Sequence, residues 1–384
     1  MTGVGAGEAP LGLVISGAAA RGPYEAGAIA EIVRALPPER PLVLLGTSSG
    51  AITAGLLAQH AGEGREAGER VCEVWRDVHG VYTNPVLTLP GTGLALGARA
   101  LGLPGHVTSV LDVAPLEDLA RQRFDPAVVA RVVGGPRVRS LGVAATVVPG
   151  RGVAARTRLF VAGEQPDVGE PLHATDVVAT RVEAEHLLAS AAIPVLFPPV
   201  WVPEPAAQRG WYIDGGVRLN APLDAALRFG VGELLVVSGH SLDPAPVEVA
   251  DGPQPDLDQA AAVSVRAVLT DALGDDVEAL RRRNRTIRDL AGDREVAGHR
   301  RVPFRVVAPA DGQLAGLARR AFDARARGPW DASWAIERLL TAGGGGIGRD
   351  ELLSLVFFDP DYARAQIEQG RADARAVLAE DARE

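Results

Sequence analysis

The chain has 384 residues, 47% of them hydrophobic and 23% charged, a composition that excludes disordered and collagen-like proteins. Its 48 acidic residues outnumber 39 basic ones, so the net charge of −9 does not favour nucleic acid or a strongly anionic membrane. A single cysteine, Cys72, excludes an internal disulfide and a cysteine metal cluster. We expect a cytoplasmic protein, peripheral to a membrane at most, because no apolar run is long enough for a signal peptide or a membrane span.

The first part of the chain alternates short apolar runs with helical patterns. Residues 11–16 and 42–45 are apolar runs that end in glycine-containing turns, which predicts buried parallel strands. Apolar residues at helical spacing follow each run, at 23–36 and 51–60. Two successive strand, turn and helix units predict a mainly parallel α/β sheet with crossover helices.

The later elements are predicted from the same patterns. Helices are expected at 66–78, 182–192, 223–229 and around 265–287, and strands at 138–147, 153–161, 211–213, 233–237 and 304–307. We divide the chain into a flexible tail at 1–10, one α/β domain at 11–310, and a helical C-terminal extension at 311–384 packed on that domain.

The pentapeptide Gly46-Thr47-Ser48-Ser49-Gly50 fits the pattern G-x-S-x-G between a predicted strand and a predicted helix. In so tight a turn the flanking positions need glycine, and the hydroxyl of Ser48 is exposed to a substrate. The amide of Ser49 then points to the place where an oxyanion would form. The alternative is a serine-rich N-cap on an ordinary turn.

A serine nucleophile needs a base, and the sequence offers two candidates. His240 follows the strand at 233–237, so a triad of Ser48, Asp214 and His240 is compatible with the chain order. Asp214 alone is the other candidate. It ends a short strand, and Gly215 and Gly216 allow a sharp turn behind it.

A small-residue turn, Ser16-Gly17-Ala18-Ala19-Ala20-Arg21-Gly22, lies between the first strand and the first helix. Its amides can converge on an anion. Arg21 could orient this turn or bind a phosphate, and pairing with a surface carboxylate such as Glu25 is an equal alternative.

Taken in order, the motifs at 17–22, 46–50 and 214–216 resemble those of the patatin-like phospholipases. The segment 189–199 is similar to the one that precedes the catalytic aspartate of that family, and 352–375 is similar to the C-terminal helices of bacterial members. The resemblance implies a three-layer α/β/α fold and hydrolysis of lipid or phospholipid acyl esters.

The resemblance also implies roles for individual residues. Ser48 would attack the ester and Asp214 would accept its proton, with no histidine, metal or other cofactor, and Trp211 and Tyr212 could help to desolvate the carboxylate. The oxyanion would be held by amides of Gly17, Ala18, Ala19 and Ser49, and the turns supported by Arg21, Gly22, Gly46, Gly50, Gly215 and Gly216. Because Ala18 and Ala19 stand where the family usually has glycine, a catalytically silent lipid-binding protein is an alternative.

Residues 81–107 fit neither the helical nor the strand pattern, because prolines and glycines interrupt a series of leucines. One hypothesis is that this segment borders a deformable, apolar substrate entrance. The other is an irregular loop whose leucines fill the core.

Overall fold

A computed structural model describes residues 9–79, 109, 113–150, 153–167, 172, 174–194, 196–242, 257–291, 295, 300–325 and 347–380. The segment 81–107 lies outside these residues, as does most of the tail expected at 1–10. Its proposed place at a substrate entrance therefore stays a prediction.

A central sheet is built in the order β5-β4-β3-β2-β1-β8-β9, with β7 paired to β3 and β6 paired to β7. The strands are β1 (Leu11–Ile15), β2 (Leu42–Thr47), β3 (Val138–Val147), β4 (Thr157–Gly163), β5 (Thr175–Ala179), β6 (Val200–Val202), β7 (Gly210–Asp214), β8 (Glu233–Val237) and β9 (Phe304–Val307). Strands β3, β2, β1, β8 and β9 are parallel, whereas β4 and β7 run antiparallel to β3. The predicted mainly parallel α/β sheet is confirmed.

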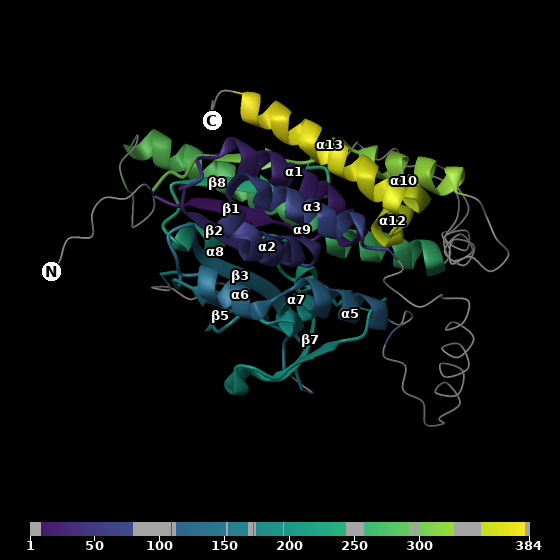
Figure 1. The fold of residues 1–384 in the computed structure, drawn as a ribbon, viewed down its shortest axis with the longest axis horizontal. Helices are drawn as coiled ribbons and strands as arrows, with labels where there is room; N and C mark the ends of the chain where they lie inside the picture. Colours follow the sequence, from purple (N-terminus) through teal and green to yellow (C-terminus); the bar gives the residue numbers. More distant parts are fainter. Residues whose placement is uncertain are drawn as a thin grey trace.

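Helices cover both faces of the sheet (Figure 1). They are α1 (Gly22–Ala35), α2 (Ser49–His60), α3 (Ala67–Arg76), α5 (Ala114–Arg123), α6 (Pro126–Val132), α7 (Ala184–Ser190), α8 (Leu223–Arg228), α9 (Leu257–Ala291), α10 (Gln313–Ala324), α12 (Ile347–Val356) and α13 (Pro360–Ala379). Successive side chains of one strand point to opposite faces of the sheet. Leu13 and Ile15 pack with α1, α2 and α3, and Val14 packs with α8 and α9.

The last helix packs directly on the first, and α13 runs along α1 at the surface of the molecule (Figure 1). A Cβ atom on Gly27 of α1 would lie 2.1 Å from the carbonyl oxygen of Ile367. A Cβ atom on Gly370 of α13 would lie 2.1 Å from the carbonyl oxygen of Tyr24. The two backbones can approach this closely only because glycine stands at both positions.

Several elements were not predicted from the sequence, namely α5, α6, β5 and β6. None of the residues of α5 is fully buried, and β6 has three residues, so neither carries a strong apolar period. Among the described helices, none combines the length and the hydropathy that a membrane crossing requires.

Candidate active site

Ser48 occupies a strained turn between β2 and α2, with φ 55° and ψ −126°. Residues other than glycine rarely adopt positive φ, and such strain is typical of functional positions. A Cβ atom on Gly46 would lie 2.3 Å from the carbonyl oxygen of Gly50, and one on Gly50 would lie 2.3 Å from that of Ile15. The turn therefore requires glycine at both flanking positions, as the sequence pattern predicts.

Ser48 and Asp214 are in contact, although 166 residues separate them. Ser48 Oγ donates a hydrogen bond of 2.6 Å to Asp214 Oδ2, and the amide of Gly216 donates one of 2.7 Å to Asp214 Oδ1. Strand β7 positions the carboxylate at its last residue, where it pairs with Ala145 of β3. The arrangement joins a hydroxyl to a carboxylate that a second donor holds in place.

Asp214 is completely buried, and this burial raises the pKa of its carboxyl group from 3.8 to about 7. The hydrogen bonds from Ser48 and Gly216 act on this pKa in the opposite direction. Tyr212, two residues earlier on β7, is also buried, whereas Trp211 is 51% exposed and contacts Trp201. Since successive side chains of a strand point to opposite faces, Trp211 does not shield Asp214, contrary to our expectation.

The turn after β1, residues 17–21, lies beside Ser48, because a Cβ atom on Gly17 would be 3.0 Å from Ser48 Cβ. Two of its amides already have partners within the protein. Gly17 N–H donates to Asn220 Oδ1 at 2.9 Å, and Ala18 N–H donates to Ser49 Oγ at 3.0 Å. We expected an oxyanion hole made of the amides of Gly17, Ala18, Ala19 and Ser49. Two of these four amides, those of Gly17 and Ala18, are instead bound to side-chain acceptors far away in the sequence.

Two expected amides remain available. Those of Ala19 and Ser49 have no hydrogen-bond partner among the described residues, and both residues line the cavity that contains Ser48. Ala19 has φ 52°, so the alanine stands where a left-handed conformation favours glycine. Ala18 has φ −146°, which is an ordinary conformation for alanine and does not call for glycine.

The buried carboxyl group of Glu25 supports the turn at 17–21 through Ser49. Ser49 Oγ, which accepts from Ala18, donates a hydrogen bond of 3.0 Å to Glu25 Oε2. Burial raises the pKa of Glu25 well above its usual range. Glu25 is therefore not a surface partner of Arg21, as one of our alternatives had it.

The remaining glycines of the three motifs are explained by close contacts. A Cβ atom on Gly22 would lie 2.2 Å from the ring of Trp75, and one on Gly215 would lie 2.4 Å from the carbonyl oxygen of Ala144. A Cβ atom on Gly216 would lie 3.0 Å from Asp214 Oδ1. These glycines allow the turns to pack against their neighbours.

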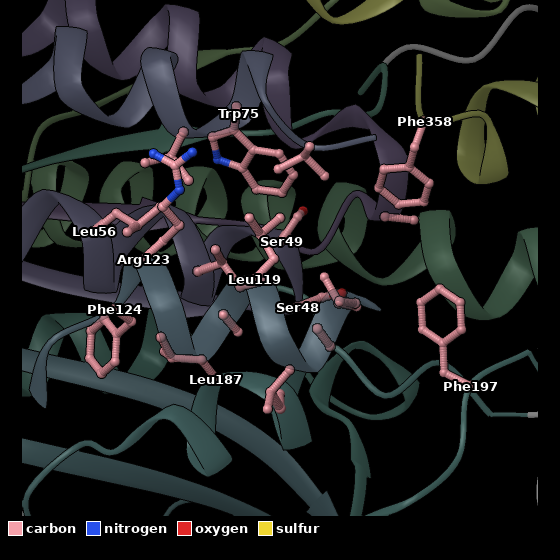
Figure 2. A pocket seen from close by; sticks show the side chains of 18 of the residues that line it. Ser48, Ser49, Leu56, Trp75, Leu119, Arg123, Phe124, Leu187, Phe197 and Phe358 are labelled. Carbon is pink, nitrogen blue, oxygen red and sulfur yellow. The ribbon is translucent and has the colours of Figure 1, made fainter. Parts of the chain in front are cut away.

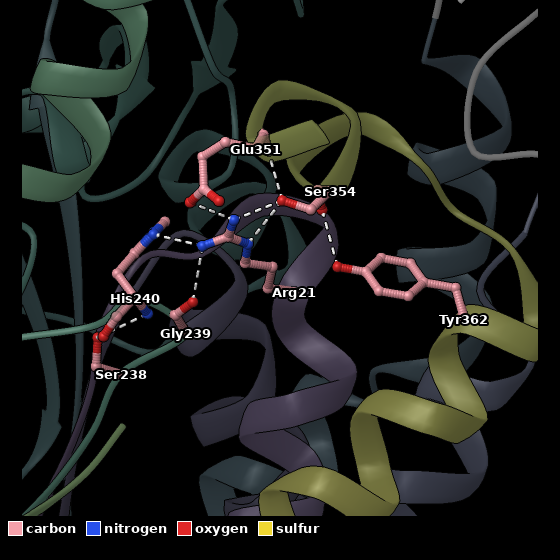
Figure 3. A network of polar contacts seen from close by, with 7 residues as sticks. All are labelled: Arg21, Ser238, Gly239, His240, Glu351, Ser354 and Tyr362. Carbon is pink, nitrogen blue, oxygen red and sulfur yellow. Dashed lines mark hydrogen bonds and ion pairs between the residues drawn. The ribbon is translucent and has the colours of Figure 1, made fainter. Parts of the chain in front are cut away.

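Arg21 is buried at the centre of a polar network that reaches the C-terminal helices (Figure 3). Its Nη2 donates to Glu351 Oε1 at 2.5 Å, its Nε donates to Ser354 Oγ at 3.1 Å, and its Nη1 donates to the carbonyl oxygen of Gly239 at 3.1 Å. Nη1 also lies 3.0 Å from His240 Nδ1. Arg21 thus joins the turn after β1 to α12 and to the segment after β8.

The position of His240 bears on the choice of base. Arginine can only donate hydrogen bonds, so His240 Nδ1 is the acceptor in this contact. The hydroxyl of Ser48 is directed to Asp214 instead. The contacts of Ser48 Oγ and His240 Nδ1 are thus made to Asp214 and Arg21, respectively.

Sequence reasoning did not identify Asn220, Ser190 or Glu25 as parts of the site. Ser190 Oγ accepts a hydrogen bond of 2.8 Å from the amide of Ser48 and donates one of 2.6 Å to Ala144 O. Asn220 lies a few residues after the Asp214 motif and Ser190 lies in the segment 189–199. The family-like segment 189–199 was therefore the available signal for Ser190, whereas nothing in the sequence marked Asn220 or Glu25 as part of the site.

An apolar cavity extends from Ser48 between helices α2, α3, α5 and α7 (Figure 2). Besides Ser48, its lining includes Ala19, Ser49, Ile52, Leu56, Trp75, Leu119, Arg123, Phe124, Leu187, Phe197 and Phe358. Leu56 follows Ser48 by eight residues, so these two lining residues are separated by about 12 Å along the axis of α2. Arg123 is paired with Asp77 at 2.7 Å, so the wall carries no uncompensated charge there.

Within the described residues, no three or more His, Cys, Asp and Glu side chains gather in a way that could hold a metal ion. The chemistry that the site's own groups can perform is attack by a hydroxyl, proton acceptance by a carboxylate, and anion binding by backbone amides.

Comparisons with known proteins add a family. A family model described as patatin-like phospholipase matches residues 13–227, more than half of the chain and all three motifs. Among solved structures, the chain is similar to VipD from Legionella pneumophila, with 12% identity and a TM-score of 0.33 over 97% of this chain and 67% of that one. No curated protein sequence matches the chain.

Proposed function

The chain belongs to the patatin-like phospholipase family, and from this premise we propose that it hydrolyses acyl esters of lipids with Ser48 and Asp214 as its catalytic residues. The hydrogen bond of 2.6 Å between Ser48 Oγ and Asp214 Oδ2 carries the proposal. Ser48 lines an apolar cavity, and this supports a substrate with an acyl chain.

In the first step Ser48 Oγ attacks the carbonyl carbon of the ester while its proton passes to Asp214 Oδ2. A carboxylate with a pKa of about 7 is a much better base than an ordinary aspartate. The tetrahedral oxyanion lies near the amides of Ala19 and Ser49, and Ser49 begins helix α2, whose N-terminus favours negative charge. The C–O bond to the alcohol then breaks, and the alcohol leaves with the proton from Asp214.

The second step releases the acyl group from Ser48. Asp214 accepts a proton from water, and the oxygen of that water forms a bond to the acyl carbon. When the bond from this carbon to Ser48 Oγ breaks, a fatty acid leaves and the serine recovers its proton. The same carboxylate acts in both steps because both remove a proton from an attacking hydroxyl group.

The cavity wall along α2 supports binding of the acyl chain. Ile52 and Leu56 follow Ser48 at helical spacing, and Leu119 of α5 and Leu187 of α7 line the same cavity (Figure 2). Burial of an acyl chain there contributes roughly 0.8 kcal/mol per methylene. We therefore propose that activity rises from butanoyl to octanoyl esters and levels off once the chain exceeds the cavity.

Hydrolysis of 4-nitrophenyl octanoate and of phosphatidylcholine vesicles by wild type, Ser48→Ala and Asp214→Asn tests the proposal. Both variants should lose activity by about 10³ or more while they keep the melting behaviour of a folded protein. Ser140→Ala, a control, removes a hydroxyl that bonds Glu164 O at the other end of the sheet, and it should stay active.

Two outcomes would contradict the proposal. A folded Asp214→Asn variant with more than about a tenth of wild-type turnover would exclude this carboxylate as the base. A folded wild type that hydrolyses neither substrate and does not react with a fluorophosphonate would favour the silent lipid-binding alternative.

A further inference from the structure

The side chain of Phe358 connects the C-terminal helices with the active-site cavity, because it lines that cavity. It lies between α12 and α13, 131 residues after the segment that the family model matches, which ends at residue 227. Its ring nevertheless lines the same cavity as Ser48 (Figure 2). A residue outside the family match thus contacts the space where a substrate would bind.

The apolar lining of the cavity lies on both sides of Ser48. In Figure 2, Leu56 and Phe124 lie on one side of Ser48, and Phe197 and Phe358 lie on the other. The carbon that Ser48 attacks carries an acyl chain and an alcohol oxygen, which must point in different directions. If the acyl chain follows α2, the alcohol lies between the two phenylalanine rings.

Phe358 is fixed by its neighbours on both sides. The ring of Phe357 packs against Phe322 and Tyr362, at centroid distances of 5.4 Å and 6.0 Å. Asp359 caps α13, because its Oδ1 accepts hydrogen bonds from the amides of Asp361 and Tyr362 at 2.9 Å and 3.1 Å. The buried residue before Phe358 and the capping residue after it fix the backbone from which this half-buried ring extends.

Arg21 couples the segment around Phe358 to the turn beside the nucleophile. It binds Glu351 and Ser354 on α12, the helix that leads to Phe358 (Figure 3). Gln366 on α13 adds a second link, because its Nε2 donates to the carbonyl oxygen of Ala20 at 3.1 Å. Both helices that flank Phe358 are therefore attached to the turn at 17–21.

We propose that Phe358 is a specificity-determining residue that limits the size of the alcohol in the ester, and that Glu351 positions it through Arg21. The inference rests on the proposed function, since it assigns the two sides of Ser48 to the two parts of an acyl ester. It predicts that the alcohol and acyl preferences of the enzyme can be changed separately.

Two series of esters test this separation. One keeps the octanoyl group and varies the alcohol from ethanol to 2-naphthol, and the other keeps 4-nitrophenol and varies the acyl group from butanoyl to hexadecanoyl. Phe358→Ala should raise the kcat/KM ratio of 2-naphthyl to ethyl octanoate by about tenfold or more and leave the acyl series unchanged. Leu119→Phe, on α5, should do the reverse by disfavouring the longer acyl chains.

Additional variants guard against loss of folding. Phe358→Leu keeps an apolar side chain and should shift the alcohol ratio in the same direction by a smaller factor. Glu351→Gln should also shift it in that direction, and because it removes the charged partner of the buried Arg21 it should lower the melting temperature as well, so the alcohol ratio is the readout that identifies a positioning role. A general loss of stability would lower both substrate series together and would not move the ratio.

The inference and the proposed function fail in different ways. If Ser48→Ala is inactive and folded Phe358→Ala and Phe358→Leu leave the alcohol ratio as in wild type, only the inference is overturned. It is also overturned if Phe358→Ala changes the acyl series instead, because the acyl chain would then lie on the Phe358 side. Absence of hydrolysis in the wild type would overturn the proposed function itself.

Discussion

Two turns meet at the candidate active site, and they are built in different ways. The turn at 46–50 follows β2 and the turn at 17–21 follows β1, which is the neighbouring parallel strand. Each holds a residue other than glycine at positive φ, Ser48 at 55° and Ala19 at 52°. Both therefore carry backbone strain, and the comparison shows what maintains it in each case.

The turn at 46–50 is held by contacts within itself and with β1, since Gly46 and Gly50 touch backbone atoms that a Cβ would displace. The turn at 17–21 depends on side chains that lie far away in the sequence. Asn220 binds the amide of Gly17, and Gln366 binds the carbonyl oxygen of Ala20. Close backbone packing at two glycines thus shapes the turn around Ser48, whose amide Ser190 also binds, whereas side chains far away in the sequence bind both ends of the turn at 17–21.

The largest effect is expected from Gly46→Ala, which adds a Cβ atom 2.3 Å from the carbonyl oxygen of Gly50. Backbone must move to admit it, so we expect a loss of more than about 3 kcal/mol in the free energy of unfolding. Gly62→Ala is the matched control, because its Cβ atom would meet nothing within 4 Å. Thermal unfolding that leaves both variants close to wild type would show that the turn is not locally fixed.

Arg21→Gln should show how far the turn at 17–21 depends on remote contacts. The substitution leaves Glu351 and the carbonyl oxygen of Gly239 without their cationic donor, and we expect a loss of about 3 kcal/mol with reduced kcat. Arg364→Gln breaks an exposed ion pair with Asp361 and should cost less than about 1 kcal/mol. Denaturant unfolding of both compares them, and equal costs would contradict the role of Arg21.

The raised pKa of Asp214 predicts two opposite responses to pH. The base must be ionised, so kcat/KM should rise with pH and level off above about 7. Because the pKa of Asp214 is higher in the folded protein than in the unfolded chain, its contribution to stability is fully present below about 3.8 and is lost as pH rises to about 7.

Asp214→Asn cannot ionise, so its stability relative to wild type should increase across that interval. Denaturant unfolding of both proteins at several pH values, beside kcat/KM of the wild type, measures the two responses. A stability difference that is constant from about pH 4 to 8 would mean that the carboxyl group titrates normally.

The smallest effect is expected from the alanines of the turn at 17–21. Ala19→Gly removes the left-handed strain at φ 52° and should stabilise the protein by up to about 1 kcal/mol with activity retained. Ala18→Gly, at φ −146°, should instead destabilise it by a similar amount through the entropy of the unfolded chain. Thermal unfolding measures both variants. If both substitutions change the free energy of unfolding in the same direction, the left-handed strain at Ala19 does not distinguish the two positions.

The sequence predicted what depends on neighbouring residues. Apolar periodicity located β1, β2, β8, α1 and α2, and glycine spacing located the turn around Ser48. The amide partners of Gly17 and Ala18 were not predictable, because the acceptor for Gly17 is 203 residues away and any small polar residue could have served. The place of Phe358 was not predictable either, because the expectation that the helices at 311–384 pack on the α/β domain does not say which of their side chains reaches the cavity.

The contact between α1 and α13 has a consequence for how the protein is made. A ribosome releases residues 11–60, with β1, Ser48 and α2, long before it releases residues 347–379. Until those last helices arrive, the groove on α1 at Gly27 is uncovered, Arg21 has no Glu351 or Ser354 to bind, and the cavity lacks Phe358. Translation order thus makes residues 347–379 the segment that completes a candidate site begun by residues 11–60, and a nascent chain carries an unfinished site until that segment has emerged.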